Sequence, residues 1–127
     1  MEHRRARRVS TQVSALIRNR GVPVAYCATR DISLEGAQLN CGGMDFESRA
    51  PLEVDFHLEG PSGRHQVRMS GVVMHCANGR IGILFTTREP EALHKLEGLI
   101  QDALSVEEEG EDQEVDRAVE PCYTIFL

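Results

Sequence analysis

Large aromatic side chains and long apolar runs are both scarce in this sequence. It has no tryptophan, and phenylalanine and tyrosine together make up 5% of its 127 residues. No apolar run approaches the ~20 residues that a membrane-spanning helix needs, and the first residues lack the apolar stretch of a secretory signal. We therefore expect a cytoplasmic protein with a modest core and no membrane insertion.

The cysteines and histidines lack the spacing of metal ligands. The four cysteines form no CxxC pair and no zinc-type pattern with histidine: Cys27, Cys41, Cys76 and Cys122. We interpret them as reduced thiols rather than as a disulfide framework. The sequence suggests no Ser-His-Asp or Cys-His arrangement and contains no P-loop. It therefore predicts neither a metal nor a cofactor, and a protein that is not an enzyme.

Charge divides the chain into three parts. The formal net charge is −6, but residues 105–120 hold eight acids and one base, whereas residues 1–8 hold four arginines. A segment of like charges with few apolar side chains does not fold around a core. We therefore expect a flexible arginine-rich arm at 1–8, one folded domain at 9–104, and an acidic tail at 105–127. The apolar end of this tail, CYTIFL at 122–127, either docks, adds to a sheet edge or stays unattached.

Alternating apolar residues predict a mainly β fold. Strands are expected at residues 9–18, 22–30, 37–40, 52–59, 67–76 and 80–85. Val24 and Tyr26 are expected in the core, and a bulge near Gly71 is expected to reconcile the two halves of the fifth strand. Asn78-Gly79 favours a two-residue hairpin turn with positive φ. Six short strands with tight turns indicate a six-stranded antiparallel β-barrel.

A C-terminal α-helix is expected after the strands. Pro90 suits its first turn, and apolar residues recur at three- and four-residue steps along one face as far as Leu104. This stripe is expected to cover one mouth of the barrel. Gly98 costs a helix about 1 kcal/mol relative to alanine, so we expect that close approach to the sheet requires it.

Two polar patches suggest a site for a guanine nucleotide. In TRDISLEG at 29–36, Asp31, Ser33 and Gly36 place a carboxylate, a hydroxyl and a residue without Cβ where an extended segment turns. HRRARRV at 3–9 supplies four guanidinium groups, which bind phosphate oxygens and stack on flat rings. Each patch also has a plain structural interpretation. The arm alone is typical of a solubilising terminus, and an Asp and Ser at a strand end are typical of a turn cap.

The order of these residues resembles the two signature motifs of the PilZ domain, the bacterial receptor for cyclic di-GMP. Arg4 and Arg8 match RxxxR, and Asp31, Ser33 and Gly36 match DxSxxG. The segment RIGILFTTREPEALHKLEGLI is similar to the last strand and closing helix of that family, so the likeness covers roughly residues 3 to 104. It implies a split-barrel fold of the PilZ type.

The resemblance also implies the residues that bind the nucleotide. The resemblance implies that arginines of the arm contact the phosphates and stack on guanine: Arg4 and Arg8, with Arg5 assisting. It also implies that the residues of TRDISLEG bind guanine: Asp31 as an acceptor, Ser33 through its hydroxyl, and Gly36 by allowing close approach. The chain departs from the commonest pattern at Glu35, where the family often has a second glycine, and a carboxylate there would weaken affinity.

The implied function is a single-domain receptor that binds cyclic di-GMP and passes the signal to an unidentified downstream protein by ordering its arm. We expect a monomer or weak dimer. The alternative is a non-catalytic adaptor of the same fold that acts through protein contacts without nucleotide. Binding of RNA or DNA is disfavoured because the rest of the chain is acidic and no aromatic residues are interleaved with the arginines.

Overall fold

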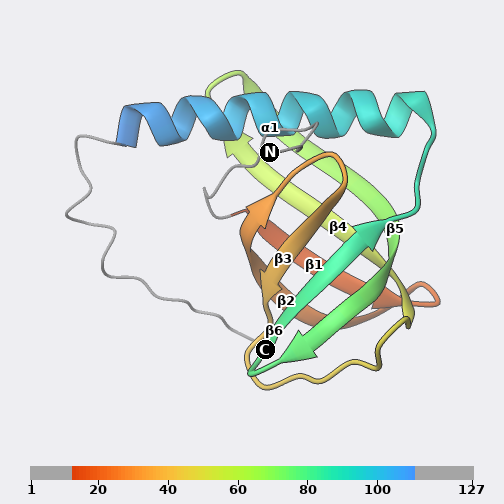
Figure 1. Cartoon of the computed structure of the whole chain (residues 1–127). Coiled ribbons are helices and arrows are strands. Elements are labelled where there is room, and N and C mark those ends of the chain that lie inside the picture. Colours follow the sequence, from red (N-terminus) through yellow and green to blue (C-terminus); the bar gives the residue numbers. More distant parts are fainter. Residues whose placement is uncertain (1–12, 111–127) are drawn as a thin grey trace, which may run out of the picture.

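Six antiparallel strands close into a barrel, and one helix lies across its end (Figure 1). The structure is a computed structural model that describes residues 13–110. The strands are paired around the barrel in the order β1-β2-β3-β6-β5-β4. The elements are β1 (Ser14–Asn19), β2 (Val22–Ile32), β3 (Gly36–Asn40), β4 (Pro51–Gly60), β5 (Gly63–Ala77), β6 (Arg80–Phe85) and α1 (Pro90–Gly110). The predicted fold class is confirmed, whereas the predicted arm and the end of the predicted tail lie outside the described residues.

Two-residue turns connect β1 to β2 and β5 to β6. Both central residues of each turn have positive φ: 56° and 80° at Arg20 and Gly21, and 55° and 79° at Asn78 and Gly79. Such turns match the right-handed twist of the strands that they join, and glycine and asparagine adopt them at low cost. The hairpin predicted at Asn78-Gly79 is therefore confirmed.

Inward-facing residues of all six strands form the core. Along β6, Ile81, Ile83 and Phe85 are at most 4% exposed, as strict alternation requires. The ring of Phe85 meets that of Phe56 on β4 edge to face, with centroids 5.8 Å apart. Aromatic pairs favour this geometry because the positive edge of one ring faces the negative face of the other.

The prediction of which face of β2 is buried is wrong. Val24 and Tyr26, expected in the core, are 39% and 60% exposed. Directly opposed residues of an antiparallel pair lie on the same face of the sheet, and Cys27 lies opposite the fully buried Ala15 of β1. The odd-numbered residues of this part of β2 therefore face inward, and its larger apolar residues face solvent.

The bulge predicted near Gly71 lies farther along β5. The pairing of β5 with β6 shifts register between Val73 and His75, so Met74 is the extra residue. Gly71 instead continues the inward face, and a Cβ there would come within 2.6 Å of the carbonyl oxygen of Leu84 on β6. A glycine is needed at this position because two strands approach closely, not because the chain bends there.

Helix α1 packs on β4 and β5 through one apolar face (Figure 1). Its buried residues are at most 5% exposed: Leu96, Leu99, Ile100 and Ala103. The helix begins at Pro90, as predicted, and continues to Gly110, beyond the last residue of the predicted stripe. Within residues 13–110, no helix is long and apolar enough to cross a membrane.

A buried carboxylate fixes α1 to the hairpin between β4 and β5. Asp102 is 7% exposed, and its Oδ2 accepts hydrogen bonds from the backbone N–H of Ser62 at 3.1 Å and from the Ser62 hydroxyl at 2.7 Å. Nε2 of His65 lies 2.7 Å from the same oxygen. These bonds, first those of Ser62 and then that of His65, hold the pKa of Asp102 below its ordinary value.

We expect the Asp102 cluster to make the fold sensitive to acid. A carboxyl whose pKa is lower in the folded protein stabilises the fold above its unfolded pKa, about 3.9. This contribution is lost as the pH falls through the folded pKa. The melting temperature should therefore drop below about pH 4, and Asp102→Asn, which cannot ionise, should show a smaller drop. The prediction would be contradicted if the melting temperatures of the two proteins fell by equal amounts between about pH 6 and about pH 2.5, a range that includes the ordinary carboxyl pKa.

Gly98 is not required by close packing, contrary to the sequence-based expectation. A Cβ at this position would meet only the ring of His65, at 3.7 Å, which is ordinary van der Waals contact. We therefore expect Gly98→Ala to stabilise the protein by about 0.5–1 kcal/mol, because alanine loses less backbone entropy in a helix. Urea denaturation measures this gain. A loss of stability would show that the helix needs the glycine for another reason.

Candidate functional site

The corner between β2 and β3 is closed by its own hydrogen bonds. The N–H of Ser33 donates to the carbonyl oxygen of Gly36 at 2.9 Å. The hydroxyl of Ser33 accepts the N–H of Glu35 at 3.1 Å and lies 3.4 Å from the Gly36 carbonyl oxygen. Ser33 is 3% exposed. The hydroxyl predicted to bind a ligand therefore also caps the turn, the alternative that its residue type suggests.

Asp31 lies on the outer surface of the barrel at the end of β2. It pairs with Gln38 of β3, next to the inward-facing pair of Ile32 and Ala37. Neighbouring residues of a strand point to opposite faces, so the Asp31 side chain points away from the core. The register shifts between Thr29 and Asp31, and this bulge re-aims the strand just before the carboxylate.

Gly36 allows β3 to approach β6 closely. It lies opposite Leu84 in the sheet, and a Cβ on it would overlap the carbonyl oxygen of Ile83. The backbone N–H of Phe85 reaches back to the carbonyl oxygen of Glu35 at 2.9 Å. The structure thus gives Gly36 a role in strand pairing that the sequence did not reveal.

Val13, the first residue that the structure describes, lies beside this corner. Arg4, Arg5 and Arg8 lie outside the described residues, which begin at Val13. The carbonyl oxygen of Val13 accepts the N–H of Thr29 at 3.0 Å, and its N–H donates to the Thr29 hydroxyl at 2.9 Å. An extended chain covers roughly 3.4 Å per residue, so Arg8 is tethered within about 17 Å of Val13. The structure therefore places Val13, the first described residue after the arm, opposite Thr29, which is two residues before Asp31 on β2.

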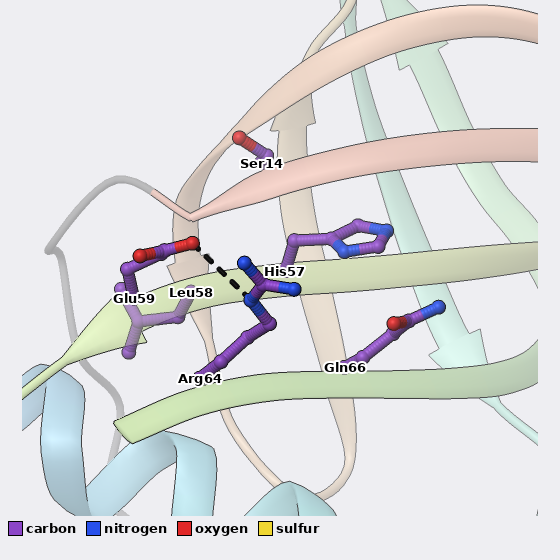
Figure 2. A pocket seen from close by; sticks show the side chains of 6 residues that line it. All are labelled: Ser14, His57, Leu58, Glu59, Arg64 and Gln66. Carbon is purple, nitrogen blue, oxygen red and sulfur yellow. Dashed lines mark hydrogen bonds and ion pairs between the residues drawn. The ribbon is translucent and has the colours of Figure 1, made fainter. Parts of the chain in front are cut away.

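A groove of about 480 Å³ lies on the other side of the start of β1 (Figure 2). It crosses three strands and is lined by Ser14, His57, Leu58, Glu59, Arg64 and Gln66. Nε of Arg64 pairs with Oε2 of Glu59 at 3.3 Å, and both side chains are largely exposed. Sequence reasoning missed this groove because its residues come together only through the register that places Ser14 opposite His57, and His57 opposite Gln66.

A second charge cluster also lies on the outer surface. Asp55 of β4 is 4% exposed; its Oδ2 accepts Nε of Arg18 at 2.8 Å and its Oδ1 accepts Nε of Arg68 at 2.6 Å. Burial alone would raise the pKa of Asp55, but the bonds from Arg68 and Arg18 outweigh it and keep the pKa below its ordinary value. These two guanidinium groups stabilise the pairing of β1, β4 and β5.

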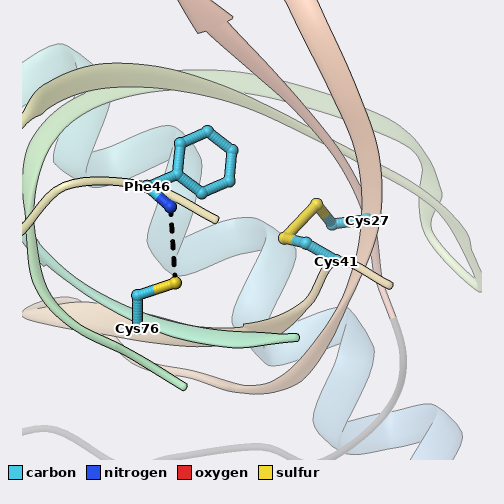
Figure 3. The surroundings of a disulfide bond; sticks show 4 residues. All are labelled: Cys27, Cys41, Phe46 and Cys76. Carbon is cyan, nitrogen blue, oxygen red and sulfur yellow. Dashed lines mark hydrogen bonds between the residues drawn. A yellow bond between two sulfur atoms is a disulfide. The ribbon is translucent and has the colours of Figure 1, made fainter. Parts of the chain in front are cut away.

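A disulfide joins the two strands of the corner (Figure 3). Cys27 of β2 and Cys41, just after β3, are bonded, with their Cα atoms 4.6 Å apart. The interpretation of these two cysteines as reduced thiols is therefore wrong. The pairing of Ala28 with Asn40 places them opposite each other at the next position of the ladder. Cys76 is a free thiol whose Sγ accepts the N–H of Phe46 at 3.4 Å, and Cys122 lies outside the described residues.

The described residues contain no group of three or more His, Cys, Asp or Glu side chains able to hold a metal ion. The polar groups that the structure describes around the corner are instead the Asp31 carboxylate and backbone amides. Such groups can bind a ligand that carries both anionic oxygens and N–H donors.

Comparison with known proteins identifies similar sequences and folds. A family model described as "PilZ domain" matches residues 2–102, and no curated protein matches the chain. The PilZ domain of YcgR from Escherichia coli, solved with c-di-GMP, has 13% sequence identity and a TM-score of 0.66 over 91% of this chain and 99% of that one. The PilZ domain of CeSA from a cellulose-synthesizing bacterium has 16% identity and a TM-score of 0.60 over 80% and 98%.

The Bacillus subtilis inhibitor of motility MotI/DgrA has the same fold in part of its length. Its TM-score is 0.70 at 14% identity, over 87% of this chain. This chain spans 54% of that protein. At such identities the three likenesses establish a shared fold.

Proposed function

Because the chain belongs to the PilZ domain family, we propose that it is a receptor for the second messenger cyclic di-GMP. The observation that carries this proposal is the position of Val13. Its two hydrogen bonds to Thr29 hold the first described residue after the arm at a position two residues from Asp31 along β2, which supports a shared site. Arginines and the carboxylate are thereby available to one ligand, although they are far apart in the sequence.

Each half of the site suits a different part of the nucleotide. Arg4 and Arg8, with Arg5 assisting, bind the phosphates and stack on guanine, since guanidinium groups do both. Asp31 accepts hydrogen bonds from N1–H and N2–H₂ of guanine, a charge-assisted pair. The turn held by Ser33 and Gly36 presents this carboxylate on the outer surface of the barrel.

The signal is passed on by ordering of the arm. Four arginines repel one another without an anion, so binding of a dianionic nucleotide favours a conformation that packs the arm against the barrel. A downstream protein then recognises the changed surface. This is coupled ordering and binding, a common form of molecular switch.

A second candidate is an adaptor that acts by protein contacts. The observation that favours it is the likeness to MotI/DgrA, a protein described as an inhibitor of motility. A truncated chain that ends at residue 110 separates the two functions, since it keeps all of α1. A receptor of this design still binds the nucleotide after truncation, whereas an adaptor acting through its tail loses its partner.

An NMR titration with cyclic di-GMP tests the proposed function. We expect saturable shifts of the backbone amides from Asp31 to Gln38, with micromolar or tighter affinity, and no matching shifts with GMP at the same concentration. The amides of the helix, around Leu99, serve as an internal control because they lie on β4 and β5. Shifts spread evenly over the barrel, or none, would refute the assignment.

A further inference from the structure

Thr29 is a buried polar residue at the junction of the arm and the corner. It is 1% exposed, and both its backbone and its side chain bond to Val13. Buried polar groups normally have hydrogen-bond partners, because losing one costs the desolvation of the other. The contact is therefore a built feature of the fold and not an incidental surface bond.

The side chain of Thr29 takes the place of a backbone group. In a regular antiparallel pair, opposed residues exchange two backbone hydrogen bonds. Here the N–H of Thr29 donates to the Val13 carbonyl oxygen at 3.0 Å, whereas the N–H of Val13 donates to the Thr29 hydroxyl at 2.9 Å. This replacement of a backbone acceptor by a side-chain hydroxyl occurs next to the register shift between Thr29 and Asp31. The hydroxyl thus preserves the pairing of Val13 at the point where β2 bulges toward the carboxylate.

We infer that Thr29 is a positioning residue for nucleotide binding, which holds the root of the arginine arm at a fixed place beside Asp31. This inference rests on the proposed function. Thr29 itself has no contact with the ligand, since its side chain is buried. It acts through Val13, from which the arm departs.

The physical effect of this contact is preorganisation. Binding must order the arm, and a residue that is already fixed adds no further cost in conformational entropy. When the hydroxyl is removed, Val13 has a buried N–H without its acceptor, and the root of the arm loosens. The nucleotide must then order one more residue. We expect the affinity to fall by about tenfold, since every 1.4 kcal/mol is a factor of ten.

Three substitutions in the full chain test the inference by calorimetry with cyclic di-GMP. Thr29→Val keeps the shape and removes the acceptor, and should bind about tenfold more weakly. Thr29→Ser restores the hydroxyl and should bind within about twofold of the original protein. Thr87→Val is the matched control, because the Thr87 hydroxyl likewise accepts a backbone N–H, that of Ser70 at 2.7 Å, and Thr87 takes no part in the pair of Val13 and Thr29. It should lose stability but not affinity.

Hydrogen exchange of the unsubstituted protein gives an independent test that does not need the variants to fold. The Val13 amide should be protected without nucleotide, to a level similar to that of Ala15 in β1. Fast exchange of Val13 that slows only when cyclic di-GMP binds would overturn the inference, as would equal affinities of Thr29→Val and Thr87→Val. Failure of the unsubstituted protein to bind cyclic di-GMP would instead refute the proposed function, while the exchange of Val13 still reports whether the contact exists.

Discussion

Replacement of Asp31 with alanine should weaken cyclic di-GMP binding by at least about a hundredfold while the barrel stays folded. The carboxylate would form two charge-assisted hydrogen bonds with guanine, each worth about 1.5–3 kcal/mol, and every 1.4 kcal/mol is a factor of ten in affinity. Asp31 faces outward on the surface of β2, so its removal opens no cavity in the core. Arg8→Ala should cause a loss of similar size from the phosphate side.

The matched control for this prediction is Glu47→Ala. Glu47 is an exposed acid in the loop between β3 and β4, so its removal changes the net charge by the same amount without touching the corner. Calorimetry on the three variants and the unsubstituted protein separates a local contact from a general change in charge. If Asp31→Ala gave the same binding heats as the unsubstituted protein, Asp31 would not take part in guanine recognition.

Gly36→Ala should destabilise the fold by about 2–4 kcal/mol, because the added Cβ would overlap the backbone of β6. The strands would have to separate at the pair of Gly36 and Leu84, which also strains the neighbouring pairs. For a domain of this size, we expect the melting temperature to fall by about 10–20 °C. Thermal unfolding followed by circular dichroism measures the change.

Gly43→Ala is the control for this substitution. Gly43 has no positive φ, and a Cβ on it would meet no atom within 4 Å. The free energy of unfolding of Gly43→Ala should therefore lie within about 0.5 kcal/mol of that of the unsubstituted protein. Well below its melting temperature, folded Gly36→Ala should still bind cyclic di-GMP. If Gly36→Ala were stable but did not bind, Gly36 would instead be needed for contact with the nucleotide.

Alternation and turn chemistry predict most of the fold, but they do not predict which face of every strand is buried. Ile81, Ile83 and Phe85 alternate with Arg80, Gly82 and Leu84, so one face of β6 carries three large apolar residues and the other carries one, and the first face is the buried one. In the first part of β2, both faces carry apolar residues, and the larger ones, Val24 and Tyr26, point outward. The pairing with β1 decides the matter, and pairing is a long-range property that local pattern does not contain.

The same limit applies to the polar residues. Asp31 and Ser33 belong to a short local motif, so the sequence identifies them without reference to distant segments. Thr29 has an unremarkable local context, and its partner Val13 is 16 positions away in the sequence. The bonds of Asp55 to Arg18 and Arg68 likewise join three strands. Clusters of this kind become visible only after the register of the barrel is known.

The bond between Cys27 and Cys41 means that one sequence can give two chemical species. It crosslinks the strand that carries Asp31 to the segment that follows β3, so its presence limits how far the two can separate. Thiol reductants in a purification buffer remove such crosslinks, and air or an oxidising compartment restores them. Affinities measured on mixed samples would average two forms of the protein that differ in how far the strands of the corner can separate. Quantitative thiol labelling of each preparation is therefore a condition for comparing any of the variants described above.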